Sequence, residues 1–570
     1  MNRNRLPIQI AILLGLLATF RPAHEAIGQS LPVHSLADQQ LSIRALLYED
    51  PYLPVTQRPY SWDAYRRTME PGDREVSGWW DRSLYQYSMD LPLGFRAGPH
   101  SLSVQNTYNS RIPYSENNAA AWYGRGHSLE WSGGVWLTSR FLTLSLQPQI
   151  VWQQNLDFLT PRFVPTNSDG EPRYIAEGIG TSLDAPFRFG PNPFWTTDWG
   201  YSSIRLHAGP VEAGYSSEPQ QWGPATRYPL TMSAHAPGVH HAFVGTRRPV
   251  RIPWVGRIQF KWMVGYAQES GYFDGSTAGE KRMLNALHAS WSPPFLEGLT
   301  LGVIRAYHIN ESDGFQWSNV LSMFDAIQKV SLSDTNPDSD GVGGNRNQVA
   351  SVYARLHMPE ARAEIWGELF REDHSYDLRD IANEPHHNSA WAIGFRKASD
   401  GPWADFYVTH LEITNLAITM TEMVRHQAYY YTHSAVRHGH TNRGQVLGAA
   451  IGPGSTSQYL GLEGYRGNWR VGTFLQRVAE NDSYHVQRNP IGSNLNNEPY
   501  GDYYRHRVNL NVGANMLYGP GPYYLTASLV WSKLYNYGRF DYGDYTLPFA
   551  DHERRDLTNV QFQMGVTYAF

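Results

Sequence analysis

The sequence predicts an all-β fold, a transmembrane outer-membrane β-barrel of about 18 antiparallel strands with a few short periplasmic helices. The last residues, 559–570, alternate strictly between apolar side chains on one face and polar or small side chains on the other, which is the period of a strand. Aromatic residues make up 14% of the chain, more than a soluble core needs and typical of girdles at the two bilayer interfaces. Beyond residue 20 no stretch approaches the roughly 20 apolar residues of a membrane helix. A membrane protein of this composition would therefore be a closed barrel.

The chain ends on Tyr568, Ala569 and Phe570. An aromatic last residue, with a second aromatic two positions before it, resembles the C-terminal signal by which bacterial outer-membrane barrels are recognised for insertion. The resemblance implies that the barrel-assembly machinery is a partner during biogenesis and that outer-membrane lipid surrounds the mature protein. The alternative is a C-terminal edge strand of a soluble domain.

The first residues have the pattern of a secretory signal. Arg3 and Arg5 precede an apolar run over residues 6–20, and residues 26–28 supply the small side chains that a signal peptidase reads. The run is too short for a spanning helix. We therefore predict a signal peptide over residues 1–28 and export to the bacterial outer membrane. The alternative is an uncleaved anchor.

Composition excludes several classes of protein. The chain has 570 residues and no cysteine, which excludes a disulfide framework and a thiolate metal site. Its net charge is only -5 and no basic block stands out, which argues against nucleic acid as a partner. The sequence contains no nucleophile-elbow motif and no phosphate-binding loop. We predict no cofactor.

Histidines and acidic residues form no complete metal site in the sequence. His438 and His440 could share one face of a strand, but no carboxylate at a fixed spacing completes a site. Asp338 and Asp340 have the spacing of the start of a calcium loop, yet Asn347 stands where the bidentate glutamate is needed. We predict no metal and an ordinary acidic turn at residues 338–340, with a calcium loop as the alternative.

The predicted barrel follows an irregular segment. Residues 29–95 are predicted to be periplasmic, with a possible short helix over 61–69, and residues 96–570 to form the barrel. Ser318 can open a helix in an insertion near 316–335. A helix on the periplasmic side, like both termini, requires an even number of strands before it. We therefore omit a strand candidate near residue 84 and expect about eight strands before the helix and about ten after it, including one near residue 444.

Long polar stretches separate some of the strands. We predict that three of them are external loops that fold over or into the mouth of the barrel: residues 153–201, 414–442 and 481–502. Aromatic residues in these loops, such as Trp195, Trp199 and Tyr429 to Tyr431, suit sugar recognition because a pyranose has an apolar face that can lie on a ring. Loop packing and interface anchoring are equally good explanations for each of them.

A motif in the first half of the chain resembles a known family. Trp222, Gly223 and Pro224, followed by Arg227, resemble the W-G-P stretch of the capsule-assembly Wzi family, and later segments, among them 363–368, follow in the family's order. The resemblance implies an eighteen-stranded barrel with an obstructed lumen and periplasmic helices. It also implies a lectin-like function, in which the barrel binds capsular or exopolysaccharide and anchors or assembles it at the cell surface. Surface polysaccharide is then the partner, and we expect a monomer.

The strand predicted at 363–368 carries further candidate residues. Its polar face holds Arg362, Glu364, Trp366 and Glu368, which could bind sugar hydroxyls or pair with basic residues on neighbouring strands. Glu364 and Glu368 lie too far apart along one strand for the paired carboxylates of a glycosidase. We therefore predict that the protein is not an enzyme. An outer-membrane diffusion porin or sugar channel is the alternative function.

Overall fold

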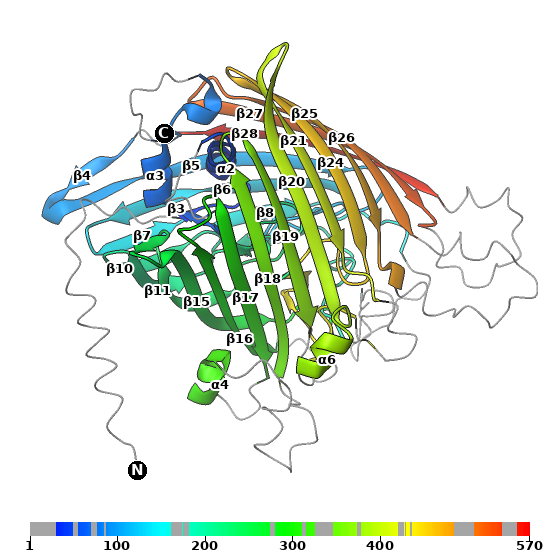
Figure 1. The fold of residues 1–570 in the computed structure, drawn as a ribbon. Coiled ribbons are helices and arrows are strands. Elements are labelled where there is room, and N and C mark those ends of the chain that lie inside the picture. Colours follow the sequence, from blue (N-terminus) through cyan, green and yellow to red (C-terminus); the bar gives the residue numbers. More distant parts are fainter. Residues whose placement is uncertain are drawn as a thin grey trace, which may run out of the picture.

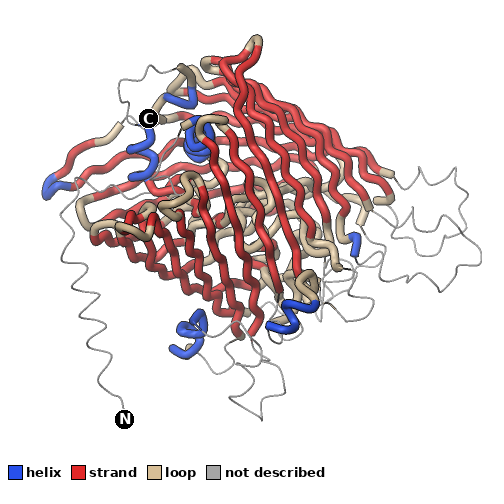
Figure 2. The backbone as a smooth tube through the Cα atoms, viewed as in Figure 1, coloured by secondary structure: helices blue, strands red, loops and turns tan. Residues whose placement is uncertain are grey.

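The computed structural model forms a tilted barrel with helices at both ends (Figures 1 and 2). No helix in the described part of the chain is long and apolar enough to cross a membrane. The described residues are 30–48, 55–69, 77–84, 87–160, 174, 182–273, 280–310, 315–324, 346–372, 378–419, 427, 429–433, 436–483, 507–537 and 556–570. The predicted signal peptide and the acidic turn at 338–340 lie outside these residues.

The wall is a closed antiparallel sheet of eighteen strands, as predicted. Three of the eighteen strands are interrupted, and each consists of two segments. The pairs of segments are β7 (Leu142–Leu146) with β8 (Gln149–Gln153), β9 (Phe194–Asp198) with β10 (Ser203–Ala208), and β13 (His240–Thr246) with β14 (Val250–Ile252). The uninterrupted strands are β5 (Phe95–Asn109), β6 (Gly126–Thr138), β11 (Val211–Ser216), β15 (Gly256–Gln268), β16 (Lys281–Ser292), β17 (Leu299–Ile309), β18 (Arg346–Met358), β19 (Ala363–Glu372), β20 (Ser389–Gly401), β21 (Ala404–Asn415), β24 (Thr456–Arg466), β25 (Trp469–Ala479), β26 (Val508–Tyr518), β27 (Tyr523–Tyr535) and β28 (Leu557–Tyr568). The last strand closes the barrel on the first, with Tyr568 opposite Leu102.

The two ends of the barrel differ in the length of their connections. At the end where β28 finishes, which we call the turn end, the strands are joined by two residues (209–210) to six residues (293–298). At the opposite end, which we call the loop end, the connections run from twelve residues (269–280) to forty residues (416–455). Outer-membrane barrels have short periplasmic turns and long external loops. The turn end is therefore the periplasmic end.

The two faces of the wall have the predicted chemistry. Along β28, Phe562, Met564 and Val566 are exposed on the outer face, while Asn559 and Gln561 are buried on the inner face. Exposed aromatic side chains gather at both rims of the barrel, as membrane girdles do. The turn-end set includes Phe141, Trp254, Phe295, Trp403, Trp469 and Tyr523, and the loop-end set includes Tyr108, Trp195, Tyr215, Tyr266, Trp391 and Trp531.

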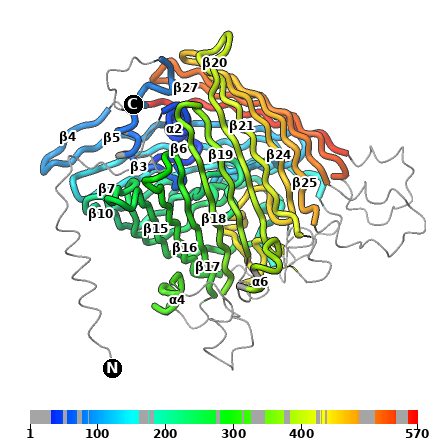
Figure 3. Tube along the Cα trace, in the orientation of Figure 1, coloured from blue at the N-terminus to red at the C-terminus, as the bar shows by residue number. Residues whose placement is uncertain are grey.

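The N-terminal segment closes the turn end from inside. Its helices, α2 (Leu36–Leu47) and α3 (Trp62–Met69), lie near the C-terminus in Figure 1, and Figure 3 shows α2 from the same side. They share a buried apolar cluster with wall residues such as Phe406 and Tyr465. The prediction of a helix over 61–69 is confirmed, whereas α2, which starts after the capping residue Ser35, was not predicted. Short strands complete the segment: β1 (Ser30–Leu31) pairs with β3 (Tyr60–Ser61), and β2 (Gln57–Arg58) pairs with β12 (Gln221–Trp222).

The predicted external loop 153–201 is too long, because residues 194–198 form the wall segment β9. Two further details of the predicted topology are wrong, and they compensate each other in the strand count. The wall strand β11 was missed because it follows β10 after a turn of two residues, 209–210, and is short. The segment near 444 is not in the wall, since β22 (Thr441–Asn442) and β23 (Gln445–Val446) form a small hairpin of their own. Nine strands therefore precede the helical insertion.

The odd number of preceding strands places the insertion at the loop end. There α4 (Trp317–Leu321) and η3 (Ser322–Phe324) lie far from the C-terminus in Figure 1. The prediction that this helix is periplasmic is therefore wrong. Its capping residue is Gln316, and Ser318 lies inside the helix. Residues 325–335 of the predicted insertion lie outside the described residues.

We predict that glycine is needed at position 394 to leave room for the side chain of Trp366. A Cβ atom at Gly394 would lie 2.2 Å from the ring of Trp366 on the neighbouring strand. Gly394→Ala should therefore lower the unfolding free energy by about 1–3 kcal/mol, measured by urea unfolding in detergent micelles. Gly367→Ala is the matched control, because a Cβ there meets its nearest neighbour at 3.8 Å. Equal stability of the two variants would contradict this account.

Candidate functional site

Two long connections fold from the loop end into the lumen. Residues 217–239 join β11 to β13, and residues 416–455 join β21 to β24. Their side chains form one apolar core with inner-face residues of the wall; this core includes Trp222, Tyr228, Leu230, Tyr431, Ala449, Met263, Ile304 and Phe370. Together with the N-terminal segment, these two connections occupy much of the lumen.

A histidine ties the two in-folded connections to the wall. The Nε2–H of His440 donates to the carbonyl of Thr231 at 2.6 Å. Its Nδ1 then accepts a hydrogen bond from Nε2 of His308, on β17, at 2.7 Å. Burial, with a contribution from nearby Arg282, lowers the pKa of His440 to about 4. The imidazole is therefore neutral at pH 7, as this pair of hydrogen bonds requires.

The W-G-P motif lies where the N-terminal segment, a lumen connection and the wall meet. Gly223 has φ +95° and its N–H donates to the carbonyl of Thr56 at 2.9 Å. A Cβ at this position would lie 3.1 Å from Glu368 Oε2. Trp222 is fully buried, with its ring 5.8 Å from that of His288, and Pro224 is buried beside it. The glycine is thus required by its backbone conformation and by close packing.

Arg227 is held from several sides. Its guanidinium pairs with Glu116 at 2.8 Å and lies 4.5 Å from the centre of the Tyr459 ring. Its backbone N–H donates to the carboxylate of Glu412. Glu116 lines the cavity described below, so Arg227 contacts a residue of that cavity without lining it.

The candidates on β19 and in the turn just before it lie in different environments. Glu364 accepts from Arg355 at 2.8 Å and pairs with Arg396 at 3.1 Å, so it belongs to a ladder of charges between strands. Trp366 covers Gly394, and Glu368 lies beside Gly223. Arg362 lies at the turn end, where it pairs with Asp400 at 2.7 Å on the surface. The structure therefore joins Glu368 to the W-G-P motif but does not bring Arg362 to the others.

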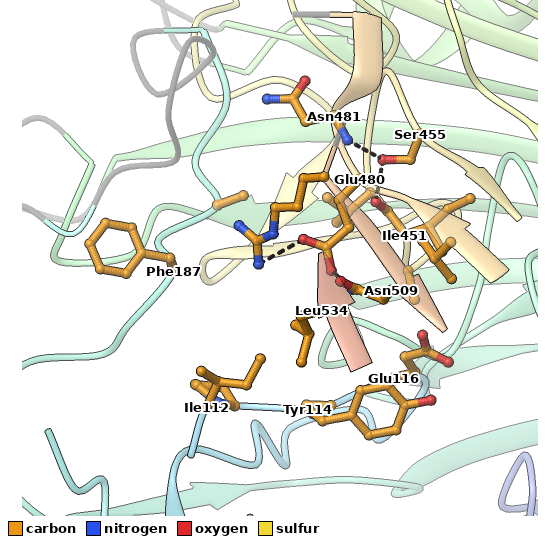
Figure 4. Close-up of a pocket in the computed structure, with 18 of the residues that line it drawn as sticks. Ile112, Tyr114, Glu116, Phe187, Ile451, Ser455, Glu480, Asn481, Asn509 and Leu534 are labelled. Atoms are coloured by element: carbon orange, nitrogen blue, oxygen red, sulfur yellow. Dashed lines mark hydrogen bonds and ion pairs between the residues drawn. The ribbon is translucent and has the colours of Figure 1, made fainter. Parts of the chain in front are cut away.

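A cavity of about 380 Å³ remains between the wall and the in-folded connections. Strands β25 to β28 contribute residues from their loop ends. The rest of the lining comes from described residues of six connections: 110–125, 154–193, 217–239, 416–455, 480–507 and 536–556. In Figure 4, Ile112 and Tyr114 lie below the hollow, Glu480 and Asn481 lie above it, and Phe187 stands to one side. None of the eight glycan-facing candidates chosen from the sequence lines this cavity, so their contact with glycan stays a prediction.

Polar groups of the cavity are held by their neighbours but keep some hydrogen-bonding capacity. Glu480 pairs with Arg507 at 2.8 Å and accepts from Asn509. Asn511 donates to Gln476 at 3.0 Å. Within the described residues, the buried amide oxygens of Asn509 and Asn511 have no hydrogen-bond partner. They can accept from a hydroxyl group that enters the cavity.

Aromatic side chains complete the lining. Tyr114, Trp122 and Phe187 are partly exposed there. Rings beside unpaired amide oxygens suit a ligand with an apolar face and many hydroxyl groups. This set could not be predicted from the sequence, because its members come from segments that lie far apart in the chain and share no motif.

The loop aromatics considered from the sequence do not line the cavity. Trp195 stands on the outer face of β9 and stacks on Trp131 with the ring centres 5.8 Å apart. Trp199 is exposed where β9 gives way to β10. Tyr430 and Tyr431 are buried in the lumen core, with Tyr429 packed nearby. Packing and interface anchoring thus explain their positions.

Comparison with protein families identifies the barrel. The model of the family described as capsule assembly protein Wzi matches residues 103–533. The chain belongs to the Wzi capsule assembly family. A comparison with curated protein sequences finds no match. Family and fold together place the chain in the bacterial outer membrane.

One solved structure shows the same fold, and others are similar at lower scores. One similar structure is described as Wzi, an outer-membrane protein involved in group 1 capsule assembly in Escherichia coli and a carbohydrate-binding β-barrel. It is 14% identical, the match covers 95% of this chain and 99% of that chain, and the TM-score is 0.58. Acinetobacter baumannii OccAB4 matches at 7% identity over 83% of this chain and 97% of its own, with a TM-score of 0.36. Pseudomonas aeruginosa OccK7 matches at 10% over 83% and 98%, with a TM-score of 0.39.

The stability of the Wzi-family barrel should depend on His440 as the pH falls. The folded pKa of about 4 lies below the unfolded value of about 6.5, so the contribution is complete above pH 6.5 and is lost as the pH falls toward 4. Between pH 7.5 and 5, the loss of unfolding free energy should be about 2 kcal/mol smaller in His440→Gln than in the wild type.

Urea unfolding at both pH values measures this difference. His386→Gln, which changes an exposed histidine, is the control and should behave as the wild type. If His440→Gln keeps the full wild-type pH dependence, the imidazole is not held neutral by the fold.

Proposed function

We propose that this barrel binds a capsular or exopolysaccharide chain in its loop-end cavity and anchors the chain at the cell surface. The observation that carries the proposal is the cavity itself. It lies at the external end, and its lining combines aromatic rings with amide oxygens that lack partners in the described residues. A sugar residue offers hydroxyl groups to such oxygens and a CH face to such rings.

Family and fold support the same class of ligand. The chain belongs to a family described by capsule assembly, and a barrel of the same fold is described as carbohydrate-binding. The predicted partners follow: surface polysaccharide as ligand, outer-membrane lipid as surroundings, and the barrel-assembly machinery during insertion. We propose a monomer, because one chain closes the wall by itself.

The geometry of the lumen acids favours binding over catalysis. Glu364 is engaged by two arginines, and Glu368 packs against Gly223. A glycosidase needs an acid and a base or nucleophile on either side of one bond. In the cavity, Glu480 is paired with Arg507 and Glu116 is paired with Arg227. We therefore propose a binding protein that is not an enzyme.

Retention of polysaccharide on cells tests the proposal. We expect deletion of the gene to leave total polysaccharide unchanged but to move it from the cell-bound to the released fraction, with both quantified separately. Restoring the wild-type gene should restore retention. If both fractions are unchanged by the deletion, anchoring is not the function.

A pair of asparagine variants tests whether the polysaccharide binds in the cavity. Asn511→Leu removes a cavity acceptor and should weaken binding of the purified polysaccharide about fivefold, the effect of losing one hydrogen bond. Asn515→Leu is the matched control, since Asn515 lies on the same strand and face but does not line the cavity. Equal loss in both variants would exclude the cavity as the binding site.

Conductance in a planar bilayer separates the anchor from the porin. We expect the wild-type barrel to give no large steady current, because the N-terminal segment and the connections 217–239 and 416–455 pack inside the wall. An open porin of similar strand number, inserted in the same bilayer, is the positive control. A large steady current from the wild type would favour the diffusion porin.

A further inference from the structure

Three side chains with metal-binding groups meet at the loop end, apart from the cavity. Glu269 directly follows β15, Glu280 directly precedes β16, and His438 belongs to the in-folded connection 416–455. One possible ligand atom from each residue lies within 4.8 Å of the other two. We propose that these residues bind a divalent metal ion of the zinc type.

The separations between the ligand atoms fit such an ion. Nε2 of His438 lies 3.1 Å from Glu269 Oε2 and 3.5 Å from Glu280 Oε2. Atoms bound at about 2.0–2.2 Å around a tetrahedral zinc ion lie roughly 3.4 Å from one another. An imidazole combined with carboxylates suits zinc, whereas calcium and magnesium take oxygen ligands.

Two buried atoms of this cluster have no hydrogen-bond partner among the described residues. Glu269 and His438 are each only 6% exposed. Glu269 Oε1 and His438 Nδ1 have no hydrogen-bond partner in the part of the chain that the structure describes. A buried carboxylate with an unpaired oxygen is costly, and a bound cation would compensate its charge.

The solvent-exposed side of the cluster and the side that faces Arg282 are also consistent with a bound ion. The side chain of Glu280 is 62% exposed, so a fourth position is open to water, as in zinc sites with three protein ligands. Arg282 is close enough to attract the charges of Asp184 and Glu269. It makes no ion pair with Glu269 among the described residues, and its Nη2 donates to the hydroxyl of Thr441 at 2.9 Å. The ion would link the β15–β16 hairpin to the connection that also lines the cavity.

Zinc titration of the full-length protein tests the proposal. Purified protein in detergent is treated with EDTA, desalted and titrated with zinc chloride by calorimetry, and bound zinc is counted by mass spectrometry. We expect one zinc ion per wild-type chain. His438→Gln and Glu269→Gln should bind at least about tenfold more weakly. His386→Gln, which removes an exposed histidine elsewhere, should bind as the wild type does.

Two results would overturn the proposal: no zinc uptake by the wild type, or equal uptake by the wild type and His438→Gln. If His438→Gln does not fold, as judged by loss of the heat-modifiable band on a gel, X-ray absorption of the wild type with zinc decides. One imidazole nitrogen with oxygen ligands at about 2.0–2.2 Å supports the site. Two or more imidazoles would assign the zinc to other histidines and exclude the proposed site, which has one histidine.

Discussion

The structure depends on one constraint: in lipid, every backbone N–H and C=O must be paired within the protein. The antiparallel ladder meets this constraint only because β28 pairs with β5 and leaves no free edge. Closure with eighteen strands has a second consequence, since a barrel of this width cannot be filled by the side chains of its own wall. The protein fills it with backbone from three other parts of the chain.

Filling a lumen with backbone creates many buried polar groups, and the structure pairs them across segment boundaries. Gly223 donates to Thr56, Tyr353 donates to the hydroxyl of Thr56 at 2.9 Å, and His440 joins Thr231 to His308. Each contact connects the wall, the N-terminal segment or an in-folded connection to another of these parts. The cavity is the space that this packing leaves at the external end.

The sequence was sufficient for the wall and for the family but not for the site. A strand that faces lipid on one side and a polar lumen on the other has a period of two, so β28 could be recognised from its residues alone. In contrast, β11 is short and closely follows β10, so it could not be distinguished. The W-G-P motif is recognisable because its position requires the backbone conformation and the small size of Gly223. That requirement arises because the motif lies where three parts of the chain pack together. The cavity residues meet no local requirement, and only the fold brings them together.

The N-terminal segment has a consequence for biogenesis. The backbone N–H of Trp79 donates to Gly467 at 3.0 Å, and Arg82 donates to Gly519 at 3.2 Å. These partners lie in the turns between the last strands, so a part of the chain that is made early can reach its final place only after most of the wall exists. Contacts between residues so distant in sequence form slowly. For this segment the order of synthesis and the order of assembly therefore differ: residues made before the wall strands complete these contacts only after the turns at Gly467 and Gly519 have formed.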